Sequence, residues 1–270
     1  MNLDQIRLDR PASGLQRLEG RFGGHAYDLH RHETYGVGLT LYGVQQFHYR
    51  GSLRASRARQ VLVLHPDEAH DGHAGEGRAF AYRMLYLDPA SVSQALDGAS
   101  PPHVAEAVAH DPATATVIEE AFVDFPQPLE PLAIDATIGR IADLLARRGD
   151  GGPRRGRGSV ALRGVRLARD FLVAESHRVV GSDELETVSG LDRFTLARHF
   201  RSVFGTSPHR YQVGRRLLCA QTLIAEGSAL SDAAAAAGFA DQSHLTRHFS
   251  ARFGVTPGRW AALSRRSQSG

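Results

Sequence analysis

The segment GFADQSHLTRHFSARFGVTP (residues 238–257) decides how the C-terminal part of this chain is expected to fold. Its last fifteen residues nearly repeat FTLARHFRSVFGTSP (residues 194–208), which lies 49 positions earlier, and seven of the fifteen positions are identical. The same offset also pairs Asp183 with Asp232 and Asp192 with Asp241. Because the similarity extends upstream of the quoted segments, an internal duplication is the simplest explanation.

Each copy is expected to form a helix, a tight turn and a second helix, over about 182–205 and 231–254. Asp192 and Asp241 can accept hydrogen bonds from free N–H groups where the second helices begin, and glycine is favoured where they end. The second helices carry apolar residues at i, i+4 and i+8: Leu196, Phe200 and Phe204 in one, and Leu245, Phe249 and Phe253 in the other. This pattern predicts two helix-turn-helix units, whose second helices enter the DNA major groove.

The polar faces of the second helices hold the candidate DNA contacts. Arg198 and Arg247 occupy matching positions, and arginine can bond a guanine edge bidentately, so we expect both to read bases. Gln242, Thr246 and Arg193 are the next candidates. Other arginines are expected to contact phosphates, which adds affinity but little sequence information: Arg201, Arg215, Arg216 and Arg252. The alternative for each arginine is a solvated helix face.

A connecting helix is expected between the two units, from Ser207 and Pro208 to about Glu226. Serine suits the N-cap position and proline the first helical position. About 18 helical residues span roughly 27 Å. Such a helix can hold two reading helices in successive major grooves, about 34 Å apart.

Residues from about 163 to 263 resemble the DNA-binding domain of the AraC/XylS family of bacterial transcription regulators. The resemblance is carried by RHF…FGTSP, by RRLLCAQTLI and by the segment 238–257. It implies two helix-turn-helix units that bind an asymmetric promoter site on double-stranded DNA, an activator role and RNA polymerase as a partner. By position, the family's base-contacting residues correspond to Phe194, Ala197, Arg198, Gln242, Ser243, Thr246 and Arg247. Ala197 is shorter than the polar residue often found there, which predicts less direct readout by the first unit.

The segment GDGGPRRGRGS (residues 149–159) is expected to be a flexible linker, because it is rich in glycine and offers nothing apolar to bury. It separates an expected domain 1–148 from a second domain 160–270. Residues 1–149 hold 14 Arg and 19 acidic residues, whereas residues 150–270 hold 18 Arg and 10 acidic residues. This asymmetry indicates that the second half meets a polyanion.

The ends and the cysteine content predict a cytoplasmic protein without a membrane partner. The segment MNLDQIRLDR (residues 1–10) lacks the apolar region of a signal peptide. No apolar run reaches membrane-spanning length. The single cysteine, Cys219, cannot form an intrachain disulfide.

The N-terminal half predicts strands followed by helices. Short segments rich in β-formers and broken by Gly, Pro or Asp suggest an antiparallel barrel or sandwich: VGLTLY (37–42), VQQFHY (44–49), QVLVLH (60–65) and FAYRMLYL (80–87). A later apolar stripe, Ile134, Ile138, Ile141 and Leu145, indicates a helix. This helix packs on its own barrel or joins a second copy in a homodimer. The expected fold class is α+β, with an N-terminal barrel and a C-terminal all-α domain.

The segments 30–51 and 61–73 resemble the cupin-like effector domain of many AraC-type regulators. His30 and His32, with His70, suit a transition metal, because alternate strand residues project to one face. Metal-dependent cupins add a glutamate further along, and Glu33 is too close to match it. We therefore expect no bound metal or cofactor, and histidines that hydrogen-bond within the barrel or line an effector pocket. The candidate pocket residues are His30, His32, Tyr35, Tyr42, His48, His70 and Tyr82.

The sequence thus predicts a transcription regulator controlled by a small molecule in the barrel, without enzymatic activity. No nucleophile with a base, phosphate-binding glycine loop or CxxC pair supports catalysis. One alternative is a metal-dependent cupin enzyme fused to a DNA-targeting domain. Another is a constitutive DNA-binding protein whose barrel serves for dimerisation.

Overall fold

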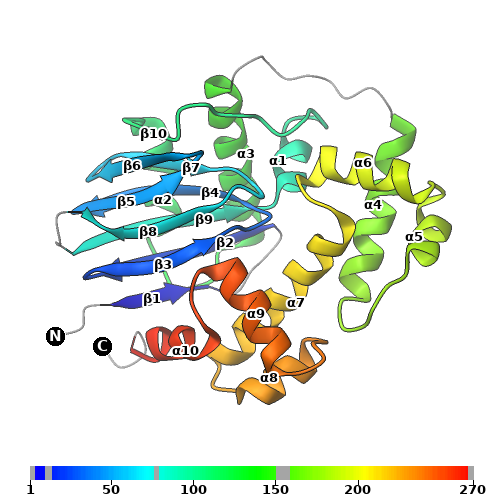
Figure 1. Cartoon of the computed structure of the whole chain (residues 1–270). Helices are drawn as coiled ribbons and strands as arrows, with labels where there is room; N and C mark the ends of the chain where they lie inside the picture. Colours follow the sequence, from blue (N-terminus) through cyan, green and yellow to red (C-terminus); the bar gives the residue numbers. More distant parts are fainter. Residues whose placement is uncertain (1–3, 10–13, 76–78, 150–158, 267–270) are drawn as a thin grey trace.

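The N-terminal part of the chain forms two antiparallel β-sheets (Figure 1). The computed structural model describes residues 4–9, 14–75, 79–149 and 159–266. One sheet has the strand order β1-β2-β9-β4-β7-β10, and the other has the order β3-β8-β5-β6. The strands are β1 Gln5–Leu8, β2 Leu15–Phe22, β3 His25–His30, β4 Tyr35–Tyr42, β5 Val44–Tyr49, β6 Ser52–Arg57, β7 Val61–Leu64, β8 His70–Ala74, β9 Phe80–Leu87 and β10 Val108–Ala109.

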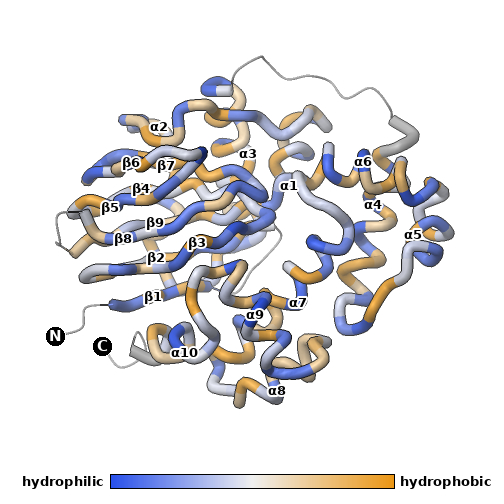
Figure 2. Tube along the Cα trace, in the orientation of Figure 1, coloured by the Kyte–Doolittle hydropathy of each residue, from blue (hydrophilic) through white to orange (hydrophobic). Residues whose placement is uncertain are grey.

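The two sheets bury aromatic side chains between them. Phe22 and Phe80 from the larger sheet share one core with Tyr27 and Phe47 from the smaller sheet. The rings of Phe22 and Tyr27 are 6.2 Å apart, edge to face. Figure 2 shows apolar and polar residues alternating along several strands, as expected when opposite strand faces meet different environments. The prediction of an antiparallel cupin-like domain is confirmed.

Three helices pack on this domain: α1 Pro89–Ala95, α2 Pro112–Ala121 and α3 Pro131–Arg148. The apolar stripe of α3 is buried, with Ile138 and Ile141 in one cluster with Val37 and Leu85 of the larger sheet. The helix therefore packs on its own barrel, and this stripe is not open to a second chain.

The C-terminal part is helical, as predicted. Its helices are α4 Ser159–Ala174, α5 Ser182–Ser189, α6 Arg193–Phe204, α7 Pro208–Ala225, α8 Leu230–Ala236, α9 Gln242–Phe253 and α10 Pro257–Arg266. Asp192 accepts from the N–H groups of Phe194 and Thr195 at 3.1 and 3.0 Å, and Asp241 accepts from His244 at 2.7 Å. Local capping thus fixes where α6 and α9 begin.

The first helix of the second unit begins slightly earlier than expected. The second unit is expected to begin at about residue 231, whereas α8 begins at Leu230 with Ala229 as its N-cap and without a side-chain cap. Such a start has no capping residue to reveal it. The predicted linker 149–159 lies almost wholly outside the described residues.

The second helix-turn-helix unit is docked on the barrel. Helices α9 and α10 lie against β3 and β1, respectively (Figure 1). Phe249 and Trp260 of this unit belong to the same hydrophobic cluster as Leu18 and Met84 of the barrel. Helices α4, α5 and α6 instead pack around a separate cluster that includes Phe200. The two units therefore differ in how they are held. Within the described residues, no helix has the length and apolar character needed to cross a membrane.

Candidate effector cavity and DNA-reading helices

Most predicted base-reading residues lie at the surface of α6 and α9. Phe194 is 79% exposed, and Thr246 is half-buried. The other exposed candidates are Ala197, Arg198, Arg201, Gln242, Ser243 and Arg247. The structure therefore leaves the predicted reading faces open to solvent in both units.

Arg193 is exposed but already paired. Its guanidinium lies 2.7 Å from the carboxylate of Asp183 and 2.9 Å from that of Glu186, both on α5. These contacts join the two helices of the first unit. A DNA contact by Arg193 would require this cation to exchange its acidic partners for the nucleic acid.

Two of the arginines predicted to contact phosphates are buried. Arg252 is 6% exposed and pairs with Glu33 of the barrel. Arg216 donates to the backbone carbonyls of Ser176 and Arg178. Neither guanidinium is available to a phosphate in this conformation, which corrects the expectation for both residues. Arg252 lies three residues after Phe249, so helical periodicity places it on the buried face of α9.

A cavity of about 770 Å³ lies between the barrel and the helical domain. Its barrel wall includes apolar residues of both sheets and of the strand ends, and its helical wall includes residues of α4, α7, α9 and α10. Gln16 of β2 donates to Gln221 of α7 at 3.2 Å beside it. The apolar lining consists mainly of Ile6, Leu15, Leu18, Phe22, Met84, Ile138, Leu218, Phe253, Val255 and Trp260.

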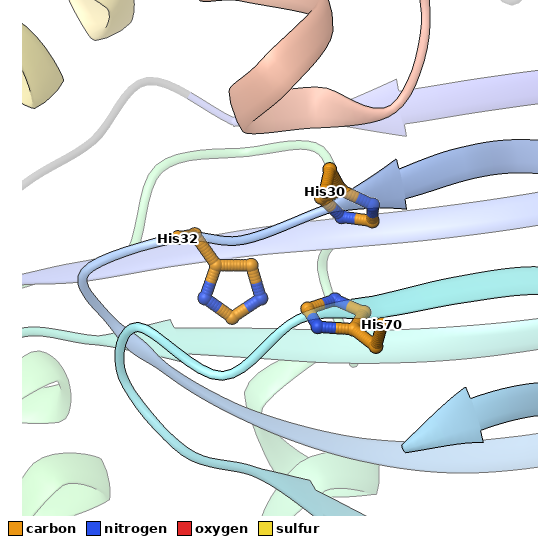
Figure 3. Close-up of side chains that lie close together, drawn as sticks. All are labelled: His30, His32 and His70. Atoms are coloured by element: carbon orange, nitrogen blue, oxygen red, sulfur yellow. The ribbon is translucent and has the colours of Figure 1, made fainter. Parts of the chain in front are cut away.

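Three buried histidines face one another in this cavity (Figure 3). His30 ends β3, His32 follows it, and His70 begins β8. One ring nitrogen of each lies within 4.8 Å of the other two. Each Nδ1 is hydrogen-bonded to a nearby carbonyl: His30 to Asp28 at 2.8 Å, His32 to Thr34 at 2.8 Å and His70 to Glu68 at 3.0 Å. These bonds make Nδ1 the protonated nitrogen of each neutral ring.

Burial keeps the three rings uncharged. It lowers the pKa of His70 to about 4 and the pKa of His30 and His32 well below the usual value, because an apolar surrounding disfavours the cation. The neighbouring histidines lower the pKa of His30 and His32 further. Nε2 of His32 is buried and has no hydrogen-bond partner among the described residues.

An ion pair between Glu33 and Arg252 joins the barrel to the end of α9 beside this cavity. Burial raises the pKa of the Glu33 carboxyl, whereas the nearby Arg252 lowers it. Two backbone bonds support the same contact: Asp28 N–H donates to Gly254 at 2.7 Å, and Arg31 N–H donates to Ala251 at 3.2 Å. The last turn of α9 is therefore bonded directly to the barrel.

The structure brings four of the seven predicted pocket residues to the cavity. His30, His32, His70 and Tyr82 line it. Tyr35, Tyr42 and His48 do not line it.

The side-chain directions along the strands explain why these three residues lie away from the cavity. Tyr35 points into the core beneath the helices and donates to the carbonyl of Pro102 at 2.6 Å. Tyr42 follows a bulge in β4 and is 38% exposed. His48 alternates with the buried Phe47 and Tyr49 and points outward to Asp71. Residue type alone did not reveal which face each strand buries.

Several cavity residues were missed in the sequence. Tyr27 and Gln16 lie on β3 and β2, which are poor in β-formers and were not expected as separate strands. Tyr86 lies in an expected strand, but its orientation was unknown. Glu33 gave no signal for a cavity role, since its partner Arg252 lies 219 positions away.

Two family models match the chain. The model described as AraC-like ligand binding domain matches residues 13–142, and the model described as helix-turn-helix domain matches residues 185–262. No curated protein matches the chain in the sequence comparison.

Solved structures of ToxT from Vibrio cholerae share the fold. One, at 1.65 Å resolution, has a TM-score of 0.66 and 9% identity, and the match covers 93% of this chain and 99% of that chain. A ToxT structure with a bound unsaturated fatty acid has a TM-score of 0.63, 11% identity and 97% coverage of both chains. A third, bound to (E)-4-(8-methylnaphthalen-1-yl)but-3-enoic acid, has a TM-score of 0.65 and 9% identity, covering 93% of this chain and 100% of that one.

The family models and the ToxT structures together match both parts of the chain. The ligand-binding model falls on the barrel and its helices, and the helix-turn-helix model falls on the duplicated units. The resemblance seen in the sequence is thereby confirmed. This chain belongs to the AraC family of transcription regulators, with an N-terminal ligand-binding domain and a C-terminal helix-turn-helix DNA-binding domain.

Proposed function

We propose that this regulator binds an amphipathic carboxylic acid in the cavity between its two domains, and that occupancy controls how the second helix-turn-helix unit meets DNA. The observation that carries the proposal is the composition of the cavity wall. It contains residues of the barrel together with Arg252 and Phe253, the last turn of a DNA-reading helix. A molecule in this space touches both domains.

The chemistry of the wall supports a ligand with an apolar body and an anionic head. Apolar and aromatic side chains form much of the lining. Arg215 of α7 also lines it and is close enough to the Asp88 carboxylate to lower the pKa of that group. No hydrogen bond or ion pair of the Arg215 guanidinium is found in the described part of the chain. An arginine is suited to bind a carboxylate through paired hydrogen bonds. ToxT, which has the same fold, was solved with an unsaturated fatty acid and with an aryl-substituted butenoic acid.

Control of DNA binding by the ligand follows from the contacts at the end of α9. The Glu33–Arg252 ion pair and the two backbone bonds hold the helix against β3. A ligand shifts this equilibrium when it binds the docked and released states with different affinity. Because Gln242, Ser243 and Arg247 lie on the same helix, release of the last turn changes where these side chains can reach.

We assign base reading to Phe194, Ala197 and Arg198 in the first unit and to Gln242, Ser243, Thr246 and Arg247 in the second. Arg201 contacts a phosphate. The family resemblance supports an activator that contacts RNA polymerase in the cytoplasm, acts as a homodimer and catalyses no reaction. The exposure of these side chains on α6 and α9 supports the DNA assignment.

The test uses oleate as the probe and compares two arginine variants. Isothermal titration should show oleate binding to the full chain, and Arg215→Gln should weaken it by roughly 10- to 150-fold, because a charge-assisted hydrogen bond contributes about 1.5–3 kcal/mol. Arg166→Gln, an exposed position on the neighbouring α4, is the matched control and should bind as the wild type does.

The second readout is DNA affinity on fragments found by genome-wide mapping of bound sites. Oleate should change the wild-type affinity and leave the affinity of Arg215→Gln unchanged at the same concentration. Equal oleate binding by both variants would contradict the assignment of the head group, and an unchanged wild-type DNA affinity would contradict control by this class of ligand.

A further inference from the structure

We infer that His30, His32 and His70 form a binding site for a divalent transition-metal ion inside the cavity between the domains. His30 ends β3, His70 begins the neighbouring β8, and His32 lies two residues beyond the end of β3. His30 and His70 are direct partners in the β3–β8 register. Their ring centroids are 4.3 Å apart, and those of His32 and His70 are 4.9 Å apart. Figure 3 shows the rings gathered where the two strands meet.

The spacing of the ligand atoms fits a metal centre after a small closure. One nitrogen from each ring lies within 4.8 Å of the others. Metal–nitrogen bonds of about 2.0–2.1 Å in a tetrahedral site place the nitrogens about 3.3 Å apart. The most distant pair therefore has to approach by at most about 1.5 Å, which small side-chain rotations can supply.

The hydrogen bond that Nδ1 of each ring makes to a carbonyl supports the same interpretation. Histidines that bind metals commonly donate their other N–H to a carbonyl or carboxylate, which fixes the tautomer and the ring orientation. All three Nδ1 atoms have such a carbonyl partner here. The buried Nε2 of His32, which has no partner in the described part of the chain, is a polar atom that a metal ion would satisfy.

The donor set selects the class of metal. Three imidazoles suit zinc, cobalt, nickel, copper or iron, whereas magnesium and calcium prefer oxygen ligands. Three protein ligands leave at least one coordination position open, and all three histidines line the cavity. An ion here adds a Lewis acid to a pocket whose wall also holds apolar side chains, arginines and the carboxylates of Glu33, Asp88, Asp135 and Asp170.

The nearby charges are balanced. Arg252 is close enough to lower the pKa of His30 and His32, which by itself disfavours a cation at this place. Its guanidinium is paired with Glu33, so the metal ion meets a neutral pair. Metal binding by the three histidines does not require a carboxylic acid effector in the cavity. The inference is therefore independent of the effector class proposed above.

The experiment uses the full-length protein, freed of metal with a chelator and titrated with Co²⁺ and Zn²⁺. Wild-type protein should bind one Co²⁺ per chain and show the visible absorption bands of a Co²⁺ ion with a low coordination number. Zn²⁺ should displace the Co²⁺ and raise Tm by several degrees. His32→Gln and His70→Gln should lose the absorption bands and the Zn²⁺-dependent rise in Tm. His48→Gln is the control, because its ring points away from the cavity on the neighbouring strand.

Two results would overturn the inference. One is a wild-type protein that takes up no Co²⁺ at 1:1 stoichiometry, a measurement that does not depend on how any variant folds. The other is a pair of folded variants, judged by circular dichroism and retained DNA binding, that bind Co²⁺ as the wild type does, which would place the ion elsewhere.

Discussion

Arg247 and Arg252 show how one residue type takes two roles on the same helix. Arg247 is exposed on α9, beside the other reading candidates. Arg252 lies five positions later, on the face that carries Phe249, and is buried against Glu33. Because an α-helix turns by about 100° per residue, side chains five positions apart point in different directions. The environment of each guanidinium, not its charge, determines whether it is open to solvent or paired with the barrel.

Replacing Arg247 with alanine should reduce binding to the cognate site by about 1–3 kcal/mol more than binding to random DNA, because a bidentate contact to one base is lost. Fluorescence anisotropy on both DNAs measures the difference. Arg201 on α6 is assigned to a phosphate, so Arg201→Ala should weaken binding to both DNAs equally. It should also reduce the slope of binding affinity against salt concentration. Equal losses on both DNAs for Arg247→Ala would show a backbone contact instead.

His65 should make stability depend on pH. Burial lowers its pKa to about 4, and its Nε2 accepts a hydrogen bond from the Val104 N–H at 3.0 Å. The unfolded chain takes up this proton near pH 6.5 and the folded chain near pH 4, so stability from His65 is present above pH 6.5 and is lost as pH falls toward 4.

At pH 5 the loss from this residue should be roughly 1–2 kcal/mol relative to pH 7.5. Urea unfolding at the two pH values should therefore show a smaller pH effect for His65→Asn than for the wild type. His110→Asn, at an exposed position, is the control. An identical pH effect in His65→Asn and wild type would exclude His65 as the titrating group.

At the level of elements, α9 is defined by a local signal at each end. Asp241 caps its start, and Gly254 ends it with a positive φ of 65°. The first unit has the same arrangement, with Asp192 and Gly205. The second unit differs in what lies beyond the glycine. A Cβ on Gly254 would lie 2.5 Å from the Asp28 carbonyl and 2.8 Å from Nδ1 of His30.

Gly254→Ala should therefore loosen the contact between α9 and β3. Gly190→Ala is the matched control, since Gly190 has a φ of 66° and open space around it. Both variants place alanine in a left-handed conformation, at a cost of about 1–2 kcal/mol, but only Gly254→Ala adds the clash. Hydrogen exchange of the Asp28 and Arg31 amides should accelerate in Gly254→Ala and not in Gly190→Ala. Equal exchange in both variants would contradict the docking contact.

For the whole molecule, the decisive feature is a core that crosses the boundary between the two halves. Phe249 and Trp260 pack with Leu18 and Met84, so the barrel and the second helix-turn-helix unit are not independent bodies. The first unit touches the barrel less, through α1 and α6. Under the function proposed above, this difference predicts that a ligand in the cavity acts on α9 more than on α6.

The sequence by itself determined the duplicated helical units, the aspartate caps of α6 and α9, the glycines that end these two helices, and four of the strands. Those signals are local: a capping aspartate, a terminal glycine and the spacing of apolar residues act within one or two turns of chain. The exposed faces of α6 and α9 follow from the same spacing.

Tertiary structure alone decided the cavity, the meeting of three histidines, and the burial of Arg252 against Glu33. Periodicity states which residues share a face, but it does not state which faces meet. That choice depends on packing between segments as distant as residues 33 and 252, where side-chain shape and the cost of burying unpaired charge act together.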